Sequence, residues 1–220
     1  MPETRRLLIE TARRMGPANL NRGAAGNLSV RTRQNGVEGY LITPSGMDYD
    51  VLVPEDLVFM RLDGTSDGRR KPSTEWRFHH DIYINRPEAG AILHAHAPFA
   101  TSLACLRRDL PAFHYMIARF GGDSIRCAEY ATFGTQALSD HALKALEGRC
   151  ACLLANHGSL VFGKTLEQMF ALAVEFESLC EQYWRACQLG EPVLLDDTEM
   201  ATVLAKFATY GQQSGTPGTP

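Results

Sequence analysis

The sequence lacks a long apolar run, since none of its 220 residues lie in a window approaching the roughly 18 apolar residues of a membrane-spanning helix. It also lacks a basic excess: 22 lysines and arginines stand against 25 acidic residues, which argues against a general nucleic-acid binder. The first 16 residues mix charged and apolar side chains at helical spacing, unlike a signal peptide. We therefore expect a cytoplasmic protein that binds neither nucleic acid nor membrane.

Paired CxxC spacing is also missing, although the chain has six cysteines. Most of them lie inside apolar segments, namely Cys105, Cys150, Cys152, Cys180 and Cys187. Buried, reduced thiols are the expected state of such cysteines in the cytosol. A Walker loop and a dinucleotide fingerprint are missing as well, so the sequence does not imply a nucleotide ligand.

What the chain does have is the composition of an ordinary folded protein, with 45% hydrophobic and 21% charged residues. Its length suffices for one domain with a substantial core. No internal repeat or linker divides the sequence, so we expect a single domain over residues 1–210. Residues 211–220 read GQQSGTPGTP, a low-complexity composition that predicts a disordered tail.

Apolar residues alternate at period two in some segments and follow helical spacing in others. Strands are expected at 27–31, 40–42, 57–62, 91–96, 125–127, 150–155 and 159–162. Helices are expected at 3–20, 72–86, from 98, 136–147, 166–188 and 197–210, with a hydroxyl residue near 73 capping the second. Strands that alternate with helices indicate an α/β fold, and the early strands are typical of antiparallel pairing, so a mixed sheet is expected.

The pair His94 and His96 stands out, because residues two apart on a strand project from the same face. A third histidine, His157, ends another apolar strand just before Gly158. Three imidazoles with one open position are typical of a catalytic zinc site. The alternative is a set of histidines that only form hydrogen bonds at a strand end.

Glu75 is placed near the start of an expected helix, where the helix dipole favours an anion. Beside a metal dication it would act as a ligand or as a general base, and otherwise it serves local electrostatics only. His79, four residues further on, and His80 are interpreted as supporting or structural residues. His114 and His141 have no partner by spacing.

Three short segments offer hydroxyl or amide side chains next to a glycine or a helix start: Gly26–Asn27, residues 43–46 and Ser73–Thr74. Such groups can form a phosphate cradle without lysine if they converge. Taken one at a time, each is an ordinary turn.

Several motifs in a fixed order resemble the class II aldolase/adducin-like superfamily over the chain from its first helix to about residue 210. They are GNLSVR (26–31), ITPSG (42–46), PSTEWRFH (72–79), HAH (94–96), HYMIA (114–118), YATFGT (130–135), NHG (156–158) and KFATYG (206–211). The resemblance implies a three-layer α/β/α sandwich around a mixed, largely antiparallel sheet. It also implies a homotetramer with active sites between subunits.

The resemblance further implies roles for individual residues. His94, His96 and His157 would hold one Zn²⁺ per subunit, with Glu75 as ligand or catalytic base. Tyr115 would serve the aldehyde oxygen from a neighbouring subunit. The residues implied to bind the substrate phosphate are Gly26, Asn27, Ser45, Gly46, Ser73 and Thr74. Phe133 and Tyr210 would line or close the aldehyde pocket, near which Arg119–Phe120 replaces smaller residues.

The implied reaction is zinc-dependent cleavage of a ketose 1-phosphate, such as L-fuculose 1-phosphate, to dihydroxyacetone phosphate and an aldehyde such as L-lactaldehyde through a metal-stabilised enediolate. One alternative keeps the same metal site: a pentulose-5-phosphate 4-epimerase or a related sugar-phosphate decarboxylase or dehydratase. Another is a non-catalytic, adducin-like interaction domain. The intact set of three histidines and Glu75 favours an enzyme.

Overall fold

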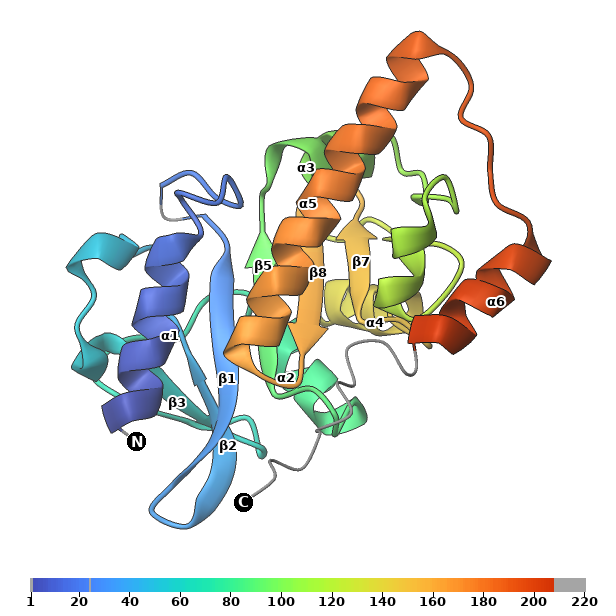
Figure 1. Cartoon of the computed structure of the whole chain (residues 1–220). Coiled ribbons are helices and arrows are strands. Elements are labelled where there is room, and N and C mark those ends of the chain that lie inside the picture. The colour runs from blue at the N-terminus through green and yellow to red at the C-terminus, as the bar shows by residue number, and fades with distance from the viewer. Residues whose placement is uncertain (1, 24, 208–220) are drawn as a thin grey trace, which may run out of the picture.

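The computed structural model describes residues 2–23 and 25–207. Its strands are β1 (Asn27–Gln34), β2 (Val37–Ile42), β3 (Val58–Arg61), β4 (Ser66–Asp67), β5 (Ala91–Ala95), β6 (Cys127–Ala128), β7 (Ala151–Leu154) and β8 (Gly158–Gly163). They form one eight-stranded sheet in the order β4-β3-β2-β1-β5-β8-β7-β6 (Figure 1). Among these strands β6 and β7 pair parallel and the other neighbours pair antiparallel. The expected mixed, largely antiparallel sheet is confirmed.

Helices cover both faces of this sheet. The α-helices are α1 (Pro2–Arg14), α2 (Trp76–Asn85), α3 (Pro98–Ala104), α4 (Gln136–Ala145), α5 (Leu166–Leu189) and α6 (Asp197–Phe207), and the 3-10 helices are η1 (Tyr49–Val51), η2 (Pro54–Asp56) and η3 (Tyr115–Phe120). In Figure 1, α1 and α5 lie in front of the strands, while α2 and α4 lie behind them. Within the described residues, no helix combines the length and apolarity needed to cross a membrane.

Two separate hydrophobic cores result from the alternation of strand side chains. Leu41 and Leu93 pack on one face of the sheet with residues of α1, α3 and α5. Their neighbours Ile42 and Ile92 pack on the other face with Phe78 of α2 and residues of α4. Because successive strand residues point to opposite faces, one apolar strand supplies both cores. This confirms the three-layer α/β/α architecture.

Two expected helix boundaries are wrong. The first helix ends at Arg14 and not near residue 20, because Gly16 and Pro17 follow and the chain turns there. The second helix begins at Trp76, and no side chain caps it. Residues 72–74 do not join this helix because Pro72 forms a β-bridge with Pro44, which keeps the segment extended.

Short elements were not predicted. The two-residue strand β4 and the three 3-10 helices span six residues at most, too few for a periodic pattern. The strand expected at 125–127 is Cys127–Ala128, while Ile125 forms an isolated bridge with Leu110. The last helix is described to Phe207, so its expected end at Tyr210 and the tail 211–220 lie outside the described residues.

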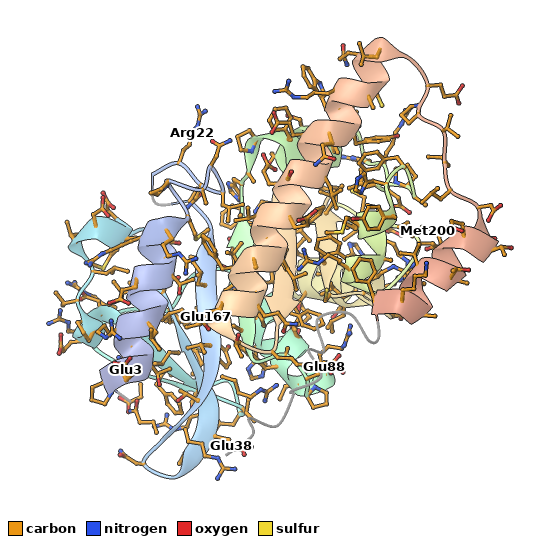
Figure 2. All side chains as sticks on the ribbon, in the orientation of Figure 1. Glu3, Arg22, Glu38, Glu88, Glu167 and Met200 are labelled. Atoms are coloured by element: carbon orange, nitrogen blue, oxygen red, sulfur yellow. The ribbon has the colours of Figure 1, made fainter. Side chains whose placement is uncertain are left out.

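Most charged side chains lie at the periphery, as Arg22 and Glu38 do in Figure 2. Three acidic residues are buried among the described residues: Asp56, Glu75 and Glu177. Asp56 forms ion pairs with two arginines, and Glu177 accepts hydrogen bonds from two backbone N–H groups at the start of α3. Glu75 instead faces His94, near the end of β5, and His157, in the turn between β7 and β8.

Candidate metal centre

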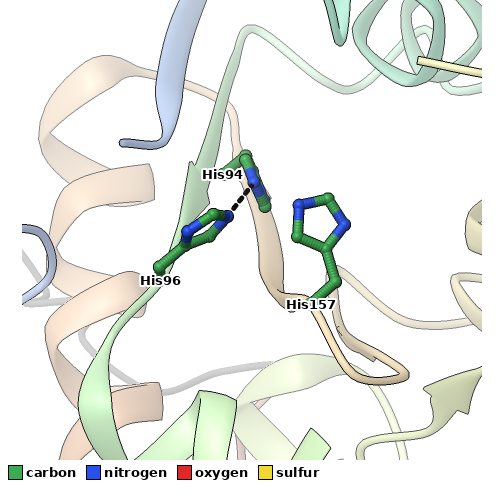
Figure 3. A group of neighbouring side chains, drawn as sticks. All are labelled: His94, His96 and His157. Atoms are coloured by element: carbon green, nitrogen blue, oxygen red, sulfur yellow. Dashed lines mark hydrogen bonds between the residues drawn. The ribbon is translucent and has the colours of Figure 1, made fainter. Parts of the chain in front are cut away.

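Three histidine side chains converge where β5 ends and where β7 turns into β8 (Figure 3). His94 Nε2 lies 3.0 Å from His96 Nε2. The ring centroid of His157 lies 4.7 Å from that of His94 and 5.0 Å from that of His96. One ring nitrogen from each residue lies within 4.8 Å of the other two. The structure thus brings together the three histidines singled out by spacing.

The sheet positions these rings. His94 pairs with Leu160 across β5 and β8, which places it beside the turn that carries His157. The chain enters this turn at Asn156, whose φ is 52°. Gly158 follows, and a Cβ there would lie 2.4 Å from the Ala95 carbonyl oxygen. Only glycine therefore lets the turn approach β5 closely enough for the histidines to meet.

Hydrogen bonding and burial leave imidazole lone pairs available. His94 Nδ1 donates to the Ser159 carbonyl oxygen over 3.0 Å, because a carbonyl can only accept, and its Nε2 then carries the lone pair. Burial, followed by the nearby charges of His94 and His157, lowers the pKa of His96 to about 4. His96 is therefore neutral at pH 7, the form that binds a metal.

The Glu75 carboxylate completes the centre. Oε1 lies 3.1 Å from His157 Nε2, and Oε2 lies 3.3 Å from His94 Nε2. Burial would raise the pKa of this carboxyl, but when protonated, His94 and His157 attract and hydrogen-bond the carboxylate strongly enough to outweigh burial and hold the pKa well below its usual range. Glu75 is 8% exposed, and among the described residues the near polar neighbour of Oε1 is His157 Nε2.

This set of donors fits a divalent transition metal. Tetrahedral Zn²⁺ with Zn–N distances of about 2.0–2.1 Å separates two ligand nitrogens by about 3.3 Å, close to the 3.0 Å between His94 and His96. A buried carboxylate that faces imidazole nitrogens is a group that a cation between them would stabilise. His94, His96 and His157 could hold the ion, and Glu75 lies beside it.

The three hydroxyl and glycine segments also converge. Thr43 N donates to Leu28 O, and Ser73 N donates to Thr43 O, which joins the three segments side by side. Gly26 and Asn27 precede Leu28 directly, and Asn27 pairs with His94 across β1 and β5. The serine and threonine side chains of this cluster are Ser45 and Thr74, both exposed, and Thr43 and Ser73, both buried.

The residues implied in the aldehyde pocket are only partly brought to this centre. Phe133 is 64% exposed, and its neighbour Gly134 lies so close that a Cβ there would sit 2.9 Å from Thr74 O. Tyr115 is 51% exposed and lies against His114 and Phe207 rather than against the three histidines. Tyr210 lies outside the described residues.

Arg119 and Phe120 both make contacts with residues of their own chain. Arg119 pairs with Glu175 of α5, and Phe120 is buried against Phe176. Both therefore attach η3 to the long helix α5.

Sequence reasoning missed one contact of the site. The Asn27 side chain, expected at the phosphate, donates from Nδ2 to Glu75 Oε2 over 3.0 Å, and its Oδ1 lies 2.5 Å from His79 Nε2. Asn27 and Glu75 are 48 residues apart, so no local pattern reveals their contact. The spacing of His79 four residues after Glu75 was the local signal, and it pointed to a supporting role.

Comparison with known proteins agrees with this geometry. Residues 6–184 match the model of the class II aldolase and adducin N-terminal domain family. The chain belongs to this family, as its ordered motifs indicated.

Two relatives and one solved structure indicate the class of reaction within this family. The chain is 55% identical to a 5-methylthioribulose-1-phosphate/5-deoxyribulose-1-phosphate aldolase of Rhodospirillum rubrum, covering 97% of this chain and 95% of that protein. It is 45% identical to the L-fuculose phosphate aldolase of Escherichia coli K12, covering 94% of each. A solved L-fuculose 1-phosphate aldolase superposes with a TM-score of 0.90 at 42% identity, covering 94% of this chain and 97% of that one. These relatives support a carbon–carbon lyase of the aldolase type.

Proposed function

We propose that this protein is a metal-dependent aldolase that cleaves a ketose 1-phosphate between C3 and C4, giving dihydroxyacetone phosphate and an aldehyde. The observation that carries the proposal is the buried Glu75 carboxylate, which lies 3.1 and 3.3 Å from two of three convergent histidines. The aldolase relatives at 55% and 45% identity support it.

A divalent ion held by His94, His96 and His157, with zinc as the proposed metal, would supply a Lewis acid for the oxygens of the substrate. Glu75 would transfer a proton to or from C3 of the substrate. In the cleavage direction the C4 hydroxyl gives its proton to the Tyr115 phenolate of a neighbouring subunit, the C3–C4 bond breaks, and its electron pair stays on C3 as an enediolate. Glu75 takes up a proton from solvent and delivers it to C3, while Tyr115 returns its proton to solvent; in the synthesis direction Glu75 removes the C3 proton from dihydroxyacetone phosphate.

The converging loops are proposed to bind the phosphate. The backbone N–H groups of Ser45 and Ser73 are used in hydrogen bonds to Lys71 O and Thr43 O. Phosphate contacts are therefore assigned to the Ser45, Ser73 and Thr74 hydroxyls and to the backbone around Gly26–Asn27 and Gly46. Neutral donors of this kind bind an anion through directed dipoles.

The aldehyde side is proposed to need a second subunit. Tyr115 is exposed and stacks on His114 and Phe207 rather than on the three convergent histidines, as expected of a residue that serves a neighbouring site. In a homotetramer Tyr115 would donate to the aldehyde oxygen, while Phe133 and Tyr210 would line or cover the pocket. A monomer in sedimentation experiments that keeps full turnover would contradict this assignment.

The candidate substrates share C1 to C4 and differ in the aldehyde that they release. Cleavage of 5-deoxyribulose 1-phosphate releases acetaldehyde, its 5-methylthio analogue releases a methylthio-acetaldehyde, and L-fuculose 1-phosphate releases lactaldehyde. We propose the two ribulose derivatives as the preferred substrates, because the relative that acts on them is 55% identical, against 45% for the L-fuculose phosphate aldolase.

A substrate panel tests the reaction. Metal-loaded protein is incubated with the three ketose 1-phosphates and with a pentulose 5-phosphate, and products are identified by NMR. Release of dihydroxyacetone phosphate is expected from the ketose 1-phosphates. A new sugar phosphate epimeric at C4, without free dihydroxyacetone phosphate, would instead show a 4-epimerase on the same site.

The Glu75→Gln variant tests the proton carrier. Glutamine keeps the size and one acceptor oxygen of the side chain but cannot accept a proton at pH 7, so cleavage should fall by about 10²- to 10⁴-fold. Metal content should stay near that of the unmodified protein, because the three imidazoles remain. Full activity in Glu75→Gln would remove Glu75 as the base.

A further inference from the structure

A buried series of hydrogen-bonded side chains reaches Glu75 from the side opposite the three convergent histidines. Tyr83 OH lies 2.9 Å from Ser29 Oγ, and Ser29 Oγ lies 2.7 Å from His79 Nδ1. His79 Nε2 lies 2.5 Å from Asn27 Oδ1, and Asn27 Nδ2 donates to Glu75 Oε2 over 3.0 Å. The chain joins α2, β1 and the carboxylate at the N-terminus of α2.

The chemistry of Asn27 fixes the direction of every hydrogen bond in this chain. Because a carboxylate only accepts, Asn27 must present its NH₂ group to Glu75 and its carbonyl oxygen to His79. His79 therefore donates from Nε2 and accepts at Nδ1. Ser29 then donates to Nδ1, and Tyr83 donates to Ser29. All four bonds point their protons toward Glu75.

The interior location makes this arrangement rigid. His79, Ser29 and Asn27 are at most 3% exposed, and Tyr83 is buried beside them. Burial, followed by the charge of His94, lowers the pKa of His79 to about 3, so its ring is neutral with one proton. Because these groups are buried, each depends on its neighbour for a hydrogen bond and for its orientation.

We infer that His79 is a positioning residue that, through Asn27, fixes Oε2 of Glu75 and leaves Oε1 as the oxygen that carries the proton. Without the His79 donor, only the hydrogen bond to Glu75 orients the Asn27 amide, and its carbonyl oxygen loses the buried partner that holds the other end in place. Oε1 faces the histidine cluster, 3.1 Å from His157 Nε2, whereas Oε2 accepts the hydrogen bond from Asn27 on the opposite side. This inference rests on the proposed function of Glu75.

Two polar substitutions of His79 distinguish its role as a hydrogen-bond donor from the packing of its ring. In His79→Gln the amide nitrogen reaches the place of Nε2, so a donor to Asn27 is restored. In His79→Asn the amide nitrogen reaches only the place of Nδ1, so the donor is lost. The readout is exchange of the carbon-bound proton of dihydroxyacetone phosphate with deuterium oxide, followed by NMR, together with kcat and KM for cleavage.

His79→Asn is expected to slow proton exchange and kcat by about 10- to 100-fold, the usual effect of losing a partner behind a site residue. KM and metal content should stay within twofold, and His79→Gln should recover most of the exchange rate. Equal losses in both variants, or a loss that appears as metal release, would show a packing role and overturn the inference. Wild-type exchange in His79→Asn would overturn it as well.

Ser29→Ala provides an independent measurement should the His79 variants fail to fold. Removing the Ser29 hydroxyl frees His79 to shift its proton to Nδ1, so exchange should slow severalfold while KM is unchanged. Unchanged exchange would contradict the directed chain. If Glu75→Gln itself exchanged protons normally, the proposed function would fail, an outcome distinct from failure of the His79 assignment.

Discussion

The close contact between Gly26 and the strand that carries His94 can be tested by adding one methyl group. Gly26 has φ of 76°, and a Cβ built there would lie 2.6 Å from the His94 carbonyl oxygen, where ordinary van der Waals contact begins at about 3.4 Å. Gly26→Ala therefore imposes backbone strain of about 1–2 kcal/mol and a clash with β5. Overpacking of this kind costs about 1–3 kcal/mol more.

Gly148→Ala is the matched control. Gly148 has φ of 67°, but a Cβ there meets nothing within 4 Å. It should carry the strain alone, so Gly26→Ala should be about 1–3 kcal/mol less stable than Gly148→Ala. The free energies of unfolding are measured in urea at pH 7, with metal removed from all samples.

Activity provides the second comparison. Relief of the clash has to separate β1 from β5, and this displaces the backbone of His94 by several tenths of an ångström. Since misplacement by about 1 Å can cost 100-fold in rate, Gly26→Ala should lose at least tenfold in kcat, while Gly148→Ala should keep normal turnover. Equal stability of the two variants together with equal activity would refute the argument that this contact positions His94.

Three further outcomes are expected. The pKa of His79 is about 3 in the folded state and about 6.5 in the unfolded state, so the unfolded state takes up its proton first as pH falls. The contribution of His79 to stability should therefore be complete above pH 6.5 and fall toward pH 3. The decline of the unfolding free energy with falling pH should be shallower in His79→Gln by about 1.4 kcal/mol per pH unit. Glu177→Ala leaves two buried N–H groups without acceptors and should lower the urea unfolding free energy by about 2–4 kcal/mol, with a smaller loss in Glu177→Gln. Chelation should lower the thermal midpoint of the unmodified protein but leave His96→Ala unchanged; an equal drop in both would count against that ligand.

Much of the fold could be predicted, because the longer elements carry strong periodic signals. The helix expected at 166–188 is observed as Leu166–Leu189, and the expected strand pair at 150–155 and 159–162 is observed as Ala151–Leu154 and Gly158–Gly163. Boundaries failed where tertiary contacts decide them. The bridge between Pro44 and Pro72 delays α2 to Trp76, and neither segment signals the other in the sequence.

The site shows the same division between local and distant information. The alternation of His94 and His96 on one strand is readable from their spacing, and their nitrogens do meet. The contact of Asn27 with Glu75 depends on backbone hydrogen bonds that join Leu28 to Thr43 and Thr43 to Ser73, segments far apart in the chain. Local patterns thus identified the donor types, and sheet pairing determined which donors face one another.

The antiparallel pairing of β1 and β5 places Asn27 beside His94, and the length of β1 puts the other end of this strand far from the candidate metal centre. The turn between β1 and β2, at Asn35 and Gly36, lies at the far end of β1 from Asn27 (Figure 1). Eight strand residues at about 3.3 Å each put that tip about 26 Å away. A fluorophore or an inserted peptide tag at this hairpin tip should report on the folded protein while leaving catalysis undisturbed.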